Sequence, residues 1–210
     1  MEKYRTIKHP AESRLEINKS EFIGIAYPLQ HEGDPEEMLQ AVKRNFPGAS
    51  HYVYAYTWGR NHSIQKFTDD GEPSGTGGMP ILELLKHKEL ENTLVVAIRY
   101  YGGVKLGTGG LKRAYSKVAQ EAILDAVVVT FTSCRIIRIR CPYHFWGKLQ
   151  YDLETKGTLV EDKLFEEEVT LTVAVPEEDV TTFIERMNEL SSSHIELELL
   201  HKDFRQLADD

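Results

Sequence analysis

The clearest periodic pattern in the sequence is a stripe of apolar residues near its middle. These residues recur at the i, i+3, i+4, i+7 spacing of one helical face, at Leu111, Ala114, Tyr115, Val118, Ala119, Ala122, Ile123 and Ala126. Two other helices are predicted mainly from their end signals. Asp34 as N-cap and Pro35 begin one that stops at Pro47, and Pro80 begins a short one through residue 86.

Three segments of the first half have strand patterns. Residues 14–29 are interrupted by polar residues 18–20, which predicts a β-hairpin. Residues 93–98 are continuously apolar, as in a central strand. Residues 51–58 alternate, so that one face is entirely aromatic, with Tyr52, Tyr54, Tyr56 and Trp58. That face fits core packing beneath a helix, and the alternative is base stacking on single-stranded nucleic acid.

The last third has a different order of elements. We expect a strand at 129–140, a helix at 143–156, strands at 158–164 and 169–175, a helix opened by Pro176, and a strand at 194–200. This βαββαβ order is typical of a ferredoxin-like fold. The sequence therefore predicts an α+β protein of two domains, residues 1–128 and 129–210.

Charge is distributed unevenly between these two parts. The 210 residues carry a formal charge of −8, which argues against a generally basic nucleic-acid-binding surface. Residues 1–126 hold 16 basic and 16 acidic side chains, whereas residues 127–210 hold 9 and 17. An anion can thus approach the first part without long-range repulsion, while the second part favours a basic partner.

The chain lacks the sequence features of secreted or membrane proteins. No apolar run approaches the roughly 20 residues that cross a bilayer, and the N-terminus has no apolar signal region. Cys134 and Cys141 lie about 23 Å apart on one predicted strand, too far to form a disulfide. We expect a cytoplasmic protein without membrane contact, in which both thiols are small buried hydrophobes.

The same four letters, GTGG, occur twice, each time directly before a helix. Glycines at a helix start let the backbone approach a ligand, and the free N–H groups favour anions, so residues 75–78 and 107–110 are both candidate phosphate sites. Only the second has basic neighbours, namely Arg99, Lys105, Lys112 and Arg113. The alternative is that these glycines serve tight turns and helix packing. We do not expect an ATP-hydrolysing P-loop, because Thr108 and Gly109 stand where Lys and Ser or Thr are required.

Acidic residues precede the first glycine cluster. Asp69, Asp70 and Glu72 fit a turn, and the alternatives are a Mg²⁺ site or a general acid/base pair. His51 is expected to be a hydrogen-bonded structural residue rather than a metal ligand. Ser74 lies among glycines but lacks the elbow motif of a serine nucleophile.

Three blocks carry a specific family resemblance. HYVYAY (51–56), FTDDGEPSGTGGMP (67–80) and RYYGGVKLGTGGLKRAYSKVA (99–119) resemble the signature of the IMPACT/YigZ family, over residues 20–126. The resemblance implies a first domain with the fold of a small-subunit ribosomal protein, EF-G domain IV and GHMP kinases, and a second domain like EF-G domain V. It also places functional weight on two loops, one of Asp69, Asp70, Gly71, Glu72, Pro73, Gly75, Gly78 and Pro80, the other of Arg99, Tyr100, Gly102, Gly103, Lys105, Leu106, Gly107, Gly109, Gly110, Leu111 and Tyr115.

Three functions follow as hypotheses. The first is a non-catalytic RNA- or ribosome-binding accessory factor in the regulation of translation, with no metal or cofactor. Its phosphate contacts would come from Arg99, Tyr100, Lys105, Gly107, Thr108, Gly109, Gly110, Lys112 and Arg113, beside a motif loop of Asp69, Asp70, Glu72, Ser74, Gly75, Gly77 and Gly78 with His51. The second is an enzyme acting on a phosphorylated small molecule. The third is a protein-interaction module whose acidic C-terminal domain binds a basic partner.

Overall fold

The computed structural model describes residues 2–192 and 194–207, which form an α+β chain of two compact units. The N-terminal unit comprises Tyr4–Val129. The C-terminal unit is formed from Thr130 onward, with the first residues of the chain. Among the described residues, no helix combines the length and the apolar sequence that crossing a lipid bilayer requires.

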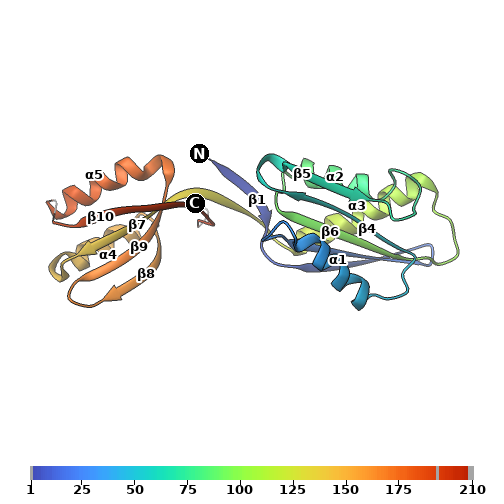
Figure 1. Cartoon of the computed structure of the whole chain (residues 1–210), viewed down its shortest axis with the longest axis horizontal. Coiled ribbons are helices and arrows are strands. Elements are labelled where there is room, and N and C mark those ends of the chain that lie inside the picture. The colour runs from blue at the N-terminus through green and yellow to red at the C-terminus, as the bar shows by residue number, and fades with distance from the viewer. Residues whose placement is uncertain (1, 193, 208–210) are drawn as a thin grey trace. The chain divides into compact units, whose positions relative to one another are not determined.

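The N-terminal unit is built on a five-stranded antiparallel sheet (Figure 1). Its strands are β2 (Ala11–Ile17), β3 (Ser20–Pro28), β4 (His51–Trp58), β5 (Ile64–Thr68) and β6 (Thr93–Tyr100), in the order β2-β3-β6-β4-β5. The predicted hairpin is confirmed as β2 and β3, joined at residues 18 and 19. The continuously apolar strand, β6, lies at the centre of the sheet. Both of its faces are covered, and this accounts for its continuous run of apolar residues.

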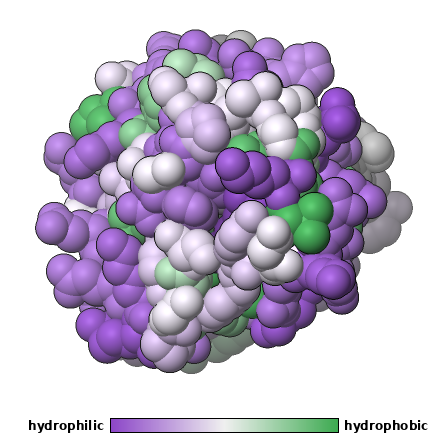
Figure 2. Space-filling view, turned by 90° about the vertical axis from the view of Figure 1, so that its right-hand side faces the viewer, coloured by the Kyte–Doolittle hydropathy of each residue, from purple (hydrophilic) through white to green (hydrophobic). Residues whose placement is uncertain are grey.

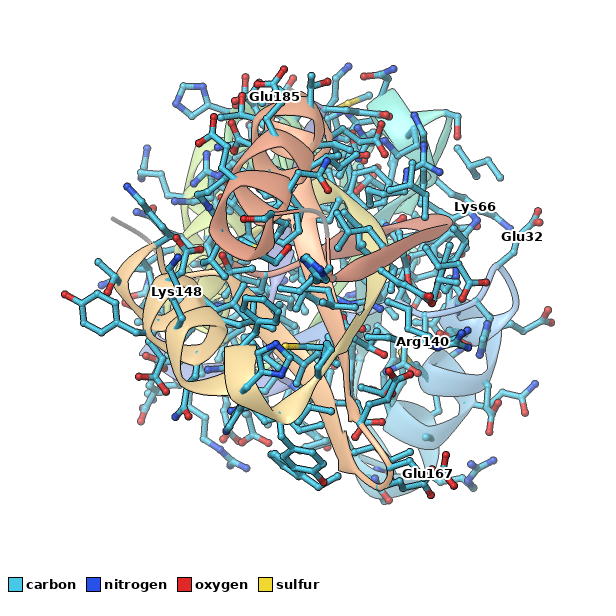
Figure 3. The ribbon with its side chains drawn as sticks, turned by 90° about the vertical axis from the view of Figure 1, so that its left-hand side faces the viewer. Glu32, Lys66, Arg140, Lys148, Glu167 and Glu185 are labelled. Carbon is cyan, nitrogen blue, oxygen red and sulfur yellow. The ribbon has the colours of Figure 1, made fainter. Side chains whose placement is uncertain are left out.

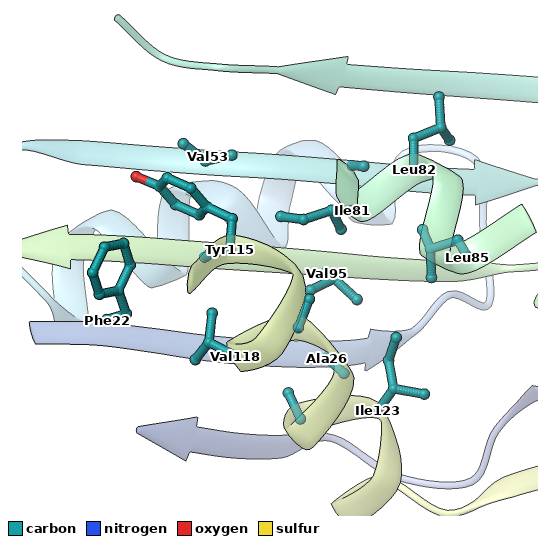
Figure 4. Packing of buried hydrophobic residues seen from close by; sticks show 14 of the residues in the cluster. Phe22, Ala26, Val53, Ile81, Leu82, Leu85, Val95, Tyr115, Val118 and Ile123 are labelled. Atoms are coloured by element: carbon teal, nitrogen blue, oxygen red, sulfur yellow. The ribbon is translucent and has the colours of Figure 1, made fainter. Parts of the chain in front are cut away.

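Helices α2 (Gly78–His87) and α3 (Gly107–Asp125) cover one face of this sheet. Every residue of the predicted apolar stripe is buried, and this confirms the helix. Tyr115 of α3 packs edge-on against Phe22 of β3, with a centroid distance of 5.2 Å, and Val53 of β4 lies beside it (Figure 4). Tyr115 thus anchors α3 on the strands that border the candidate site.

Helix α1 (Asp34–Asn45) covers the opposite face. The aromatic residues of β4 are half-buried and pack against the cluster around Val42 and Ile98, so they serve core packing as expected. One detail differs from the prediction. Asp34 is the first residue of α1 rather than its N-cap, and its carboxylate accepts the N–H groups of Gln30 and His31.

The C-terminal unit has the predicted ferredoxin-like topology. Its elements are β7 (Val128–Cys141), α4 (Tyr143–Thr155), β8 (Leu159–Phe165), β9 (Val169–Pro176), α5 (Val180–Ser191) and β10 (Glu196–Arg205). The strand order is β10-β7-β9-β8, and β1 (Lys3–Ile7) is a further neighbour of β7. Strand β10 continues to Arg205, past a register shift between Leu199 and Lys202 that ends its apolar alternation.

Helices α4 and α5 bury their apolar sides on this second sheet. Lys148 of α4 and Glu185 of α5 are exposed (Figure 3), and Lys148 Nζ donates to the carbonyl oxygen of Leu190 in α5 at 2.9 Å. Cys134 and Cys141 are free and buried, and burial raises the pKa of both thiols, that of Cys141 to about 11. Neither thiol is set up for reaction, in keeping with their expected role as packing residues.

Candidate functional site

The two glycine-rich motifs meet at one end of the N-terminal unit. We call residues 69–77, between β5 and α2, the first loop and residues 101–106, between β6 and α3, the second loop. The second loop lies at the right-hand end of Figure 1. Figure 2, which faces this end, shows a largely polar surface with small hydrophobic patches. A pocket of about 450 Å³, here called the α3 pocket, is lined by both loops and the start of α3, including His51, Glu72, Arg99, Tyr101, Lys105 and Thr108.

A buried ion pair forms one wall of the α3 pocket. The side chains of Glu72 and Arg99 are 4% and 5% exposed, and Arg99 Nη1 donates to Glu72 Oε1 at 2.7 Å. Tyr115 Oη donates to the same oxygen at 2.7 Å. Arg99 Nη2 donates to Ser20 Oγ at 3.3 Å, which also accepts the N–H of Gly102. The glycine is required here, because a Cβ on Gly102 would overlap the backbone of Lys19.

Burial and its bond to Glu72 keep Tyr115 protonated. Burial is the larger cause, and together with the hydrogen bond it raises the pKa of the Tyr115 hydroxyl well above its usual range. A protonated hydroxyl donates to Glu72 and helps to stabilise the buried carboxylate. The sequence signal for this role was that Tyr115 is the one residue of the apolar stripe with a polar atom, which needs a partner when buried.

His51 links the first loop to this wall. Its Nδ1 lies 2.8 Å from the carbonyl oxygen of Asp70, and its Nε2 lies 3.8 Å from Glu72 Oε1. The Asp70 carboxylate accepts the N–H of Tyr52 at 2.6 Å. His51 is therefore the hydrogen-bonded residue that was expected, and it also lines the pocket.

The first GTGG segment already holds an anion, which the chain itself supplies. The Asp69 carboxylate accepts the N–H groups of Gly75, Gly77 and Gly78 at 2.8 to 2.9 Å. Burial alone would raise the pKa of Asp69, but these bonds and one from Thr76 outweigh burial and lower it below its usual value. The candidate phosphate site at residues 75–78 is thus corrected: its donors are occupied, so it is not open to an external phosphate.

The second GTGG segment differs in structure and in occupancy. The sequence placed residues 107–110 in a loop, whereas the structure makes them the first turn of α3. Among the residues that the structure describes, no side chain caps this helix end, whose N-cap residue is Leu106. The first N–H groups of a helix have no intrahelical acceptor and carry partial positive charge. Gly107 and Thr108 line the α3 pocket together with Lys105, so the uncapped end and one exposed cation face the same space.

Two of the expected phosphate contacts are corrected. Arg99 is buried and paired with Glu72, so its charge is balanced within the chain. Tyr100 packs on the α1 side of the sheet, and its hydroxyl donates to the carbonyl oxygen of Pro47 at 3.3 Å. The neighbouring Tyr101 lines the pocket instead. The alternation of strand residues was the signal that consecutive tyrosines point to opposite sides.

Lys112 and Arg113 do not line the α3 pocket. Both are exposed on α3 and line a separate cavity of about 230 Å³ beside Gly75, Met79 and Glu83. The cations expected to act together are therefore divided between two neighbouring surfaces at the start of α3.

The acidic residues of the first loop form a structured turn. Within the described parts of the chain, no group of three His, Cys, Asp or Glu side chains is arranged to hold a metal ion. Asp69 and Asp70 bind backbone N–H groups, and Glu72 binds Arg99 and Tyr115. Ser74 is an exposed residue of the same loop.

Comparisons with known proteins cover both units. A model of the Impact N-terminal domain matches residues 18–123, and a model of a domain of unknown function, DUF1949, matches residues 139–193. The chain is 38% identical to the IMPACT family member YvyE of Bacillus subtilis, over 90% of this chain and 87% of that protein. It is 29% identical to the IMPACT family member YigZ of Escherichia coli, over 87% of this chain and 90% of that protein.

A solved structure agrees with these matches. The crystal structure of a hypothetical protein, 26% identical, has a TM-score of 0.60 and covers 96% of this chain and 98% of that chain. Since the family model and full-length relatives match a chain that carries both GTGG motifs, the protein belongs to the IMPACT family.

Proposed function

We propose that this protein is a cytoplasmic, non-catalytic RNA-binding accessory factor that acts at the ribosome and contacts RNA phosphates at the start of α3. The observation that carries the proposal is the uncapped N-terminus of α3, which opens with Lys105 into one pocket. A helix N-terminus with a neighbouring cation binds phosphate oxygens through backbone N–H groups and charge.

The first loop supports this assignment from within the same molecule. There the same tetrapeptide binds a carboxylate through three backbone N–H groups. The second tetrapeptide has no such internal acid, because the residue six positions before Gly107 is Tyr101, whereas the residue six positions before Gly75 is Asp69. An external anion can take the place that Asp69 fills in the first loop.

Charge distribution supports placing the RNA contact on the N-terminal unit. Lys112 and Arg113 extend the basic surface along α3, so a strand bound at the pocket can place its next phosphates near them. The C-terminal part carries the whole net charge of −8 and repels phosphate. We assign it to a basic protein partner.

Ribosome co-sedimentation, with fluorescence anisotropy on a single-stranded RNA, tests the proposal. We expect wild-type affinity to fall steeply between about 50 and 200 mM salt, because phosphate contacts release counterions. The variant Lys105→Ala/Lys112→Ala/Arg113→Ala should lose at least about tenfold in affinity and have a shallower salt dependence.

The matched control removes three exposed positive charges elsewhere on the same unit. In Lys66→Ala/Lys86→Ala/Lys117→Ala the net charge changes equally, but these residues lie on β5, late in α2 and in the middle of α3. We expect a loss of less than about threefold. Equal losses in the two triple variants would overturn the assignment of the contact to the start of α3.

A further inference from the structure

We infer that the α3 pocket holds one ribonucleotide unit, with its phosphate at the start of α3, its ribose hydroxyls at Glu72 and its base against Tyr101. This inference rests on the proposed function for the phosphate contact and adds the class of ligand. The unit is either a free mononucleotide or the unstacked 3′-terminal nucleotide of an RNA strand, because both carry a 5′-phosphate and two adjacent ribose hydroxyls.

The buried carboxylate in the wall selects a ligand that carries a donor. Arg99 and Tyr115 both donate to Glu72 Oε1, and Oε2 accepts no hydrogen bond from the described residues. The Glu72 side chain is only 4% exposed and lines the pocket. Oε2 retains accessible surface, so a ligand hydroxyl in the pocket can reach this oxygen and donate to it. Carboxylates bind ribose hydroxyls in this way in dinucleotide-binding proteins.

Arg99 adds a complementary requirement. Its Nε is buried and has no hydrogen-bond partner among the described residues, although both terminal nitrogens have partners. A hydroxyl both donates and accepts, so a ribose hydroxyl that donates to Glu72 can also face the guanidinium charge of Arg99, which favours an acceptor. A bare phosphate next to Glu72 would instead be repelled by the carboxylate.

The two ends of the pocket therefore prefer opposite groups. The α3 end offers backbone donors and Lys105, which favour an anion, and the Glu72 end offers an acceptor, which favours a hydroxyl. A sugar phosphate carries both groups. A ligand with two anionic ends, or with two neutral ends, satisfies only one side.

Tyr101 supplies a surface for a planar group. Tyr101 is a large exposed aromatic residue, with 47% of its surface accessible. The centroid of its ring lies 5.1 Å from the guanidinium carbon of Arg99. Because Arg99 is itself fixed by Glu72 and Ser20, the ring is backed by a rigid group. Nucleobases stack on such rings without sequence preference.

The size of the space limits the ligand to one unit. A volume of about 450 Å³ is that of a small-ligand site and cannot admit a duplex. A single nucleotide in a pocket that reads the ribose hydroxyl distinguishes RNA from DNA, because the 2′-hydroxyl is the group in which they differ.

Calorimetric titration of the wild-type protein with four small ligands tests the inference. The ligands are AMP, dAMP, ribose 5-phosphate and inorganic phosphate. We expect AMP to bind at least about tenfold more tightly than dAMP, since dAMP lacks a hydroxyl that a charged group binds. Ribose 5-phosphate should bind about tenfold more weakly than AMP, because it lacks the stacked base. Equal binding of AMP and dAMP would overturn the hydroxyl contact.

Two pairs of variants locate the contacts. Tyr101→Leu should weaken AMP about tenfold and leave ribose 5-phosphate unchanged, whereas Tyr101→Phe, which keeps the ring, should bind AMP like the wild type. Glu72→Gln should reduce the preference for AMP over dAMP. Because this change leaves Arg99 with a neutral partner and can destabilise the fold, the comparison of ligands on the wild type decides the outcome.

Oligonucleotides separate this inference from the proposed function. If single-stranded RNA and DNA of equal sequence bind equally, with the losses expected for the Lys105 triple variant, the phosphate contact stands and the ribonucleotide pocket is overturned. If neither RNA nor inorganic phosphate binds, both proposals fail. Preference for RNA that is lost in Tyr101→Leu supports both.

Discussion

The two GTGG segments have identical sequences and different structural surroundings. Residues 75–78 are held by the Asp69 carboxylate, and three of the four are buried. Residues 107–110 begin α3 without a side-chain cap, and the first three are exposed. The difference teaches that the same tetrapeptide at a helix start can be held by an acid of the chain itself or be left exposed without one.

The space around the glycines distinguishes the two segments only in part, because the equivalent Gly75 and Gly107 both have a positive φ and open surroundings. A Cβ on Gly78 would lie 2.5 Å from the carbonyl oxygen of Thr68, and one on Gly77 would lie 2.8 Å from a methyl group of Val53. A Cβ on Gly107 would meet nothing within 4 Å, and one on Gly109 would meet only the end of the Arg113 side chain. Packing explains Gly77 and Gly78, and a positive φ explains Gly75 and Gly107.

The largest expected effect is that of Gly78→Ala. Its methyl group would press on the backbone of β5, and we expect the free energy of unfolding to fall by about 3 kcal/mol in urea denaturation. Gly109→Ala is the matched control in the second segment. There a methyl group in the first turn should change stability by less than about 1 kcal/mol, while RNA affinity falls several-fold. Equal destabilisation by both would remove the distinction between the two segments.

Asp69→Ala should have the next largest effect. It leaves backbone N–H groups of the first loop without an acceptor, and we expect a loss of about 2 kcal/mol in the free energy of unfolding at pH 7. The folded state lowers the pKa of Asp69. Its contribution is therefore complete above the unfolded pKa near 4 and disappears as the pH falls through the lower folded value.

Urea denaturation between pH 2 and pH 7 checks this dependence. The difference between wild type and Asp69→Ala should shrink towards low pH. Asp125→Ala, which removes an exposed carboxylate at the end of α3, should show a small difference at every pH. A constant gap for Asp69→Ala would show that its carboxylate does not hold the loop through charge.

The smallest expected effect comes from placing an acid at the open helix end. Thr108→Glu should raise the free energy of unfolding by about 0.5 kcal/mol, since an acidic first turn favours the helix dipole. The same charge should weaken RNA binding about tenfold by repelling phosphate. Thr108→Gln controls for size. Equal RNA affinity of the two variants, measured by anisotropy, would contradict an anion site at this end.

Much of the fold was predictable because its signals are local. The stripe on α3 and the apolar run of β6 reflect which faces are buried, and burial follows from residues close together in the chain. The residues at which helices and strands begin and end were less predictable. The start of α3 at Gly107 was not predicted, because the four small residues there give no apolar signal. The end of β10 at Arg205 was not predicted, because a register shift interrupts the alternation of apolar and polar residues before the strand ends.

The sequence predicted several residues of the candidate site, but not which of their side chains pair with each other. Lys105, Thr108 and the glycines of the second segment line or border the pocket, as their motif indicated. The sequence suggested a turn or a metal ligand for Glu72 and a phosphate contact for Arg99, yet the two form one buried pair. No local pattern distinguishes a basic residue that faces solvent from one that pairs with an acid in a distant loop.

The sequence by itself determined the two α+β units, the family and the positions of the glycine-rich helix starts. Their periodicity and motifs are carried by neighbouring residues, so no long-range information is needed. Only the tertiary structure decided which helix start stays open. Pairing of β4 with β6 places His51 opposite Arg99, and the first loop then brings Asp69 to its own N–H groups and Glu72 to Arg99. These contacts depend on strand register and loop closure, which join residues far apart in the chain.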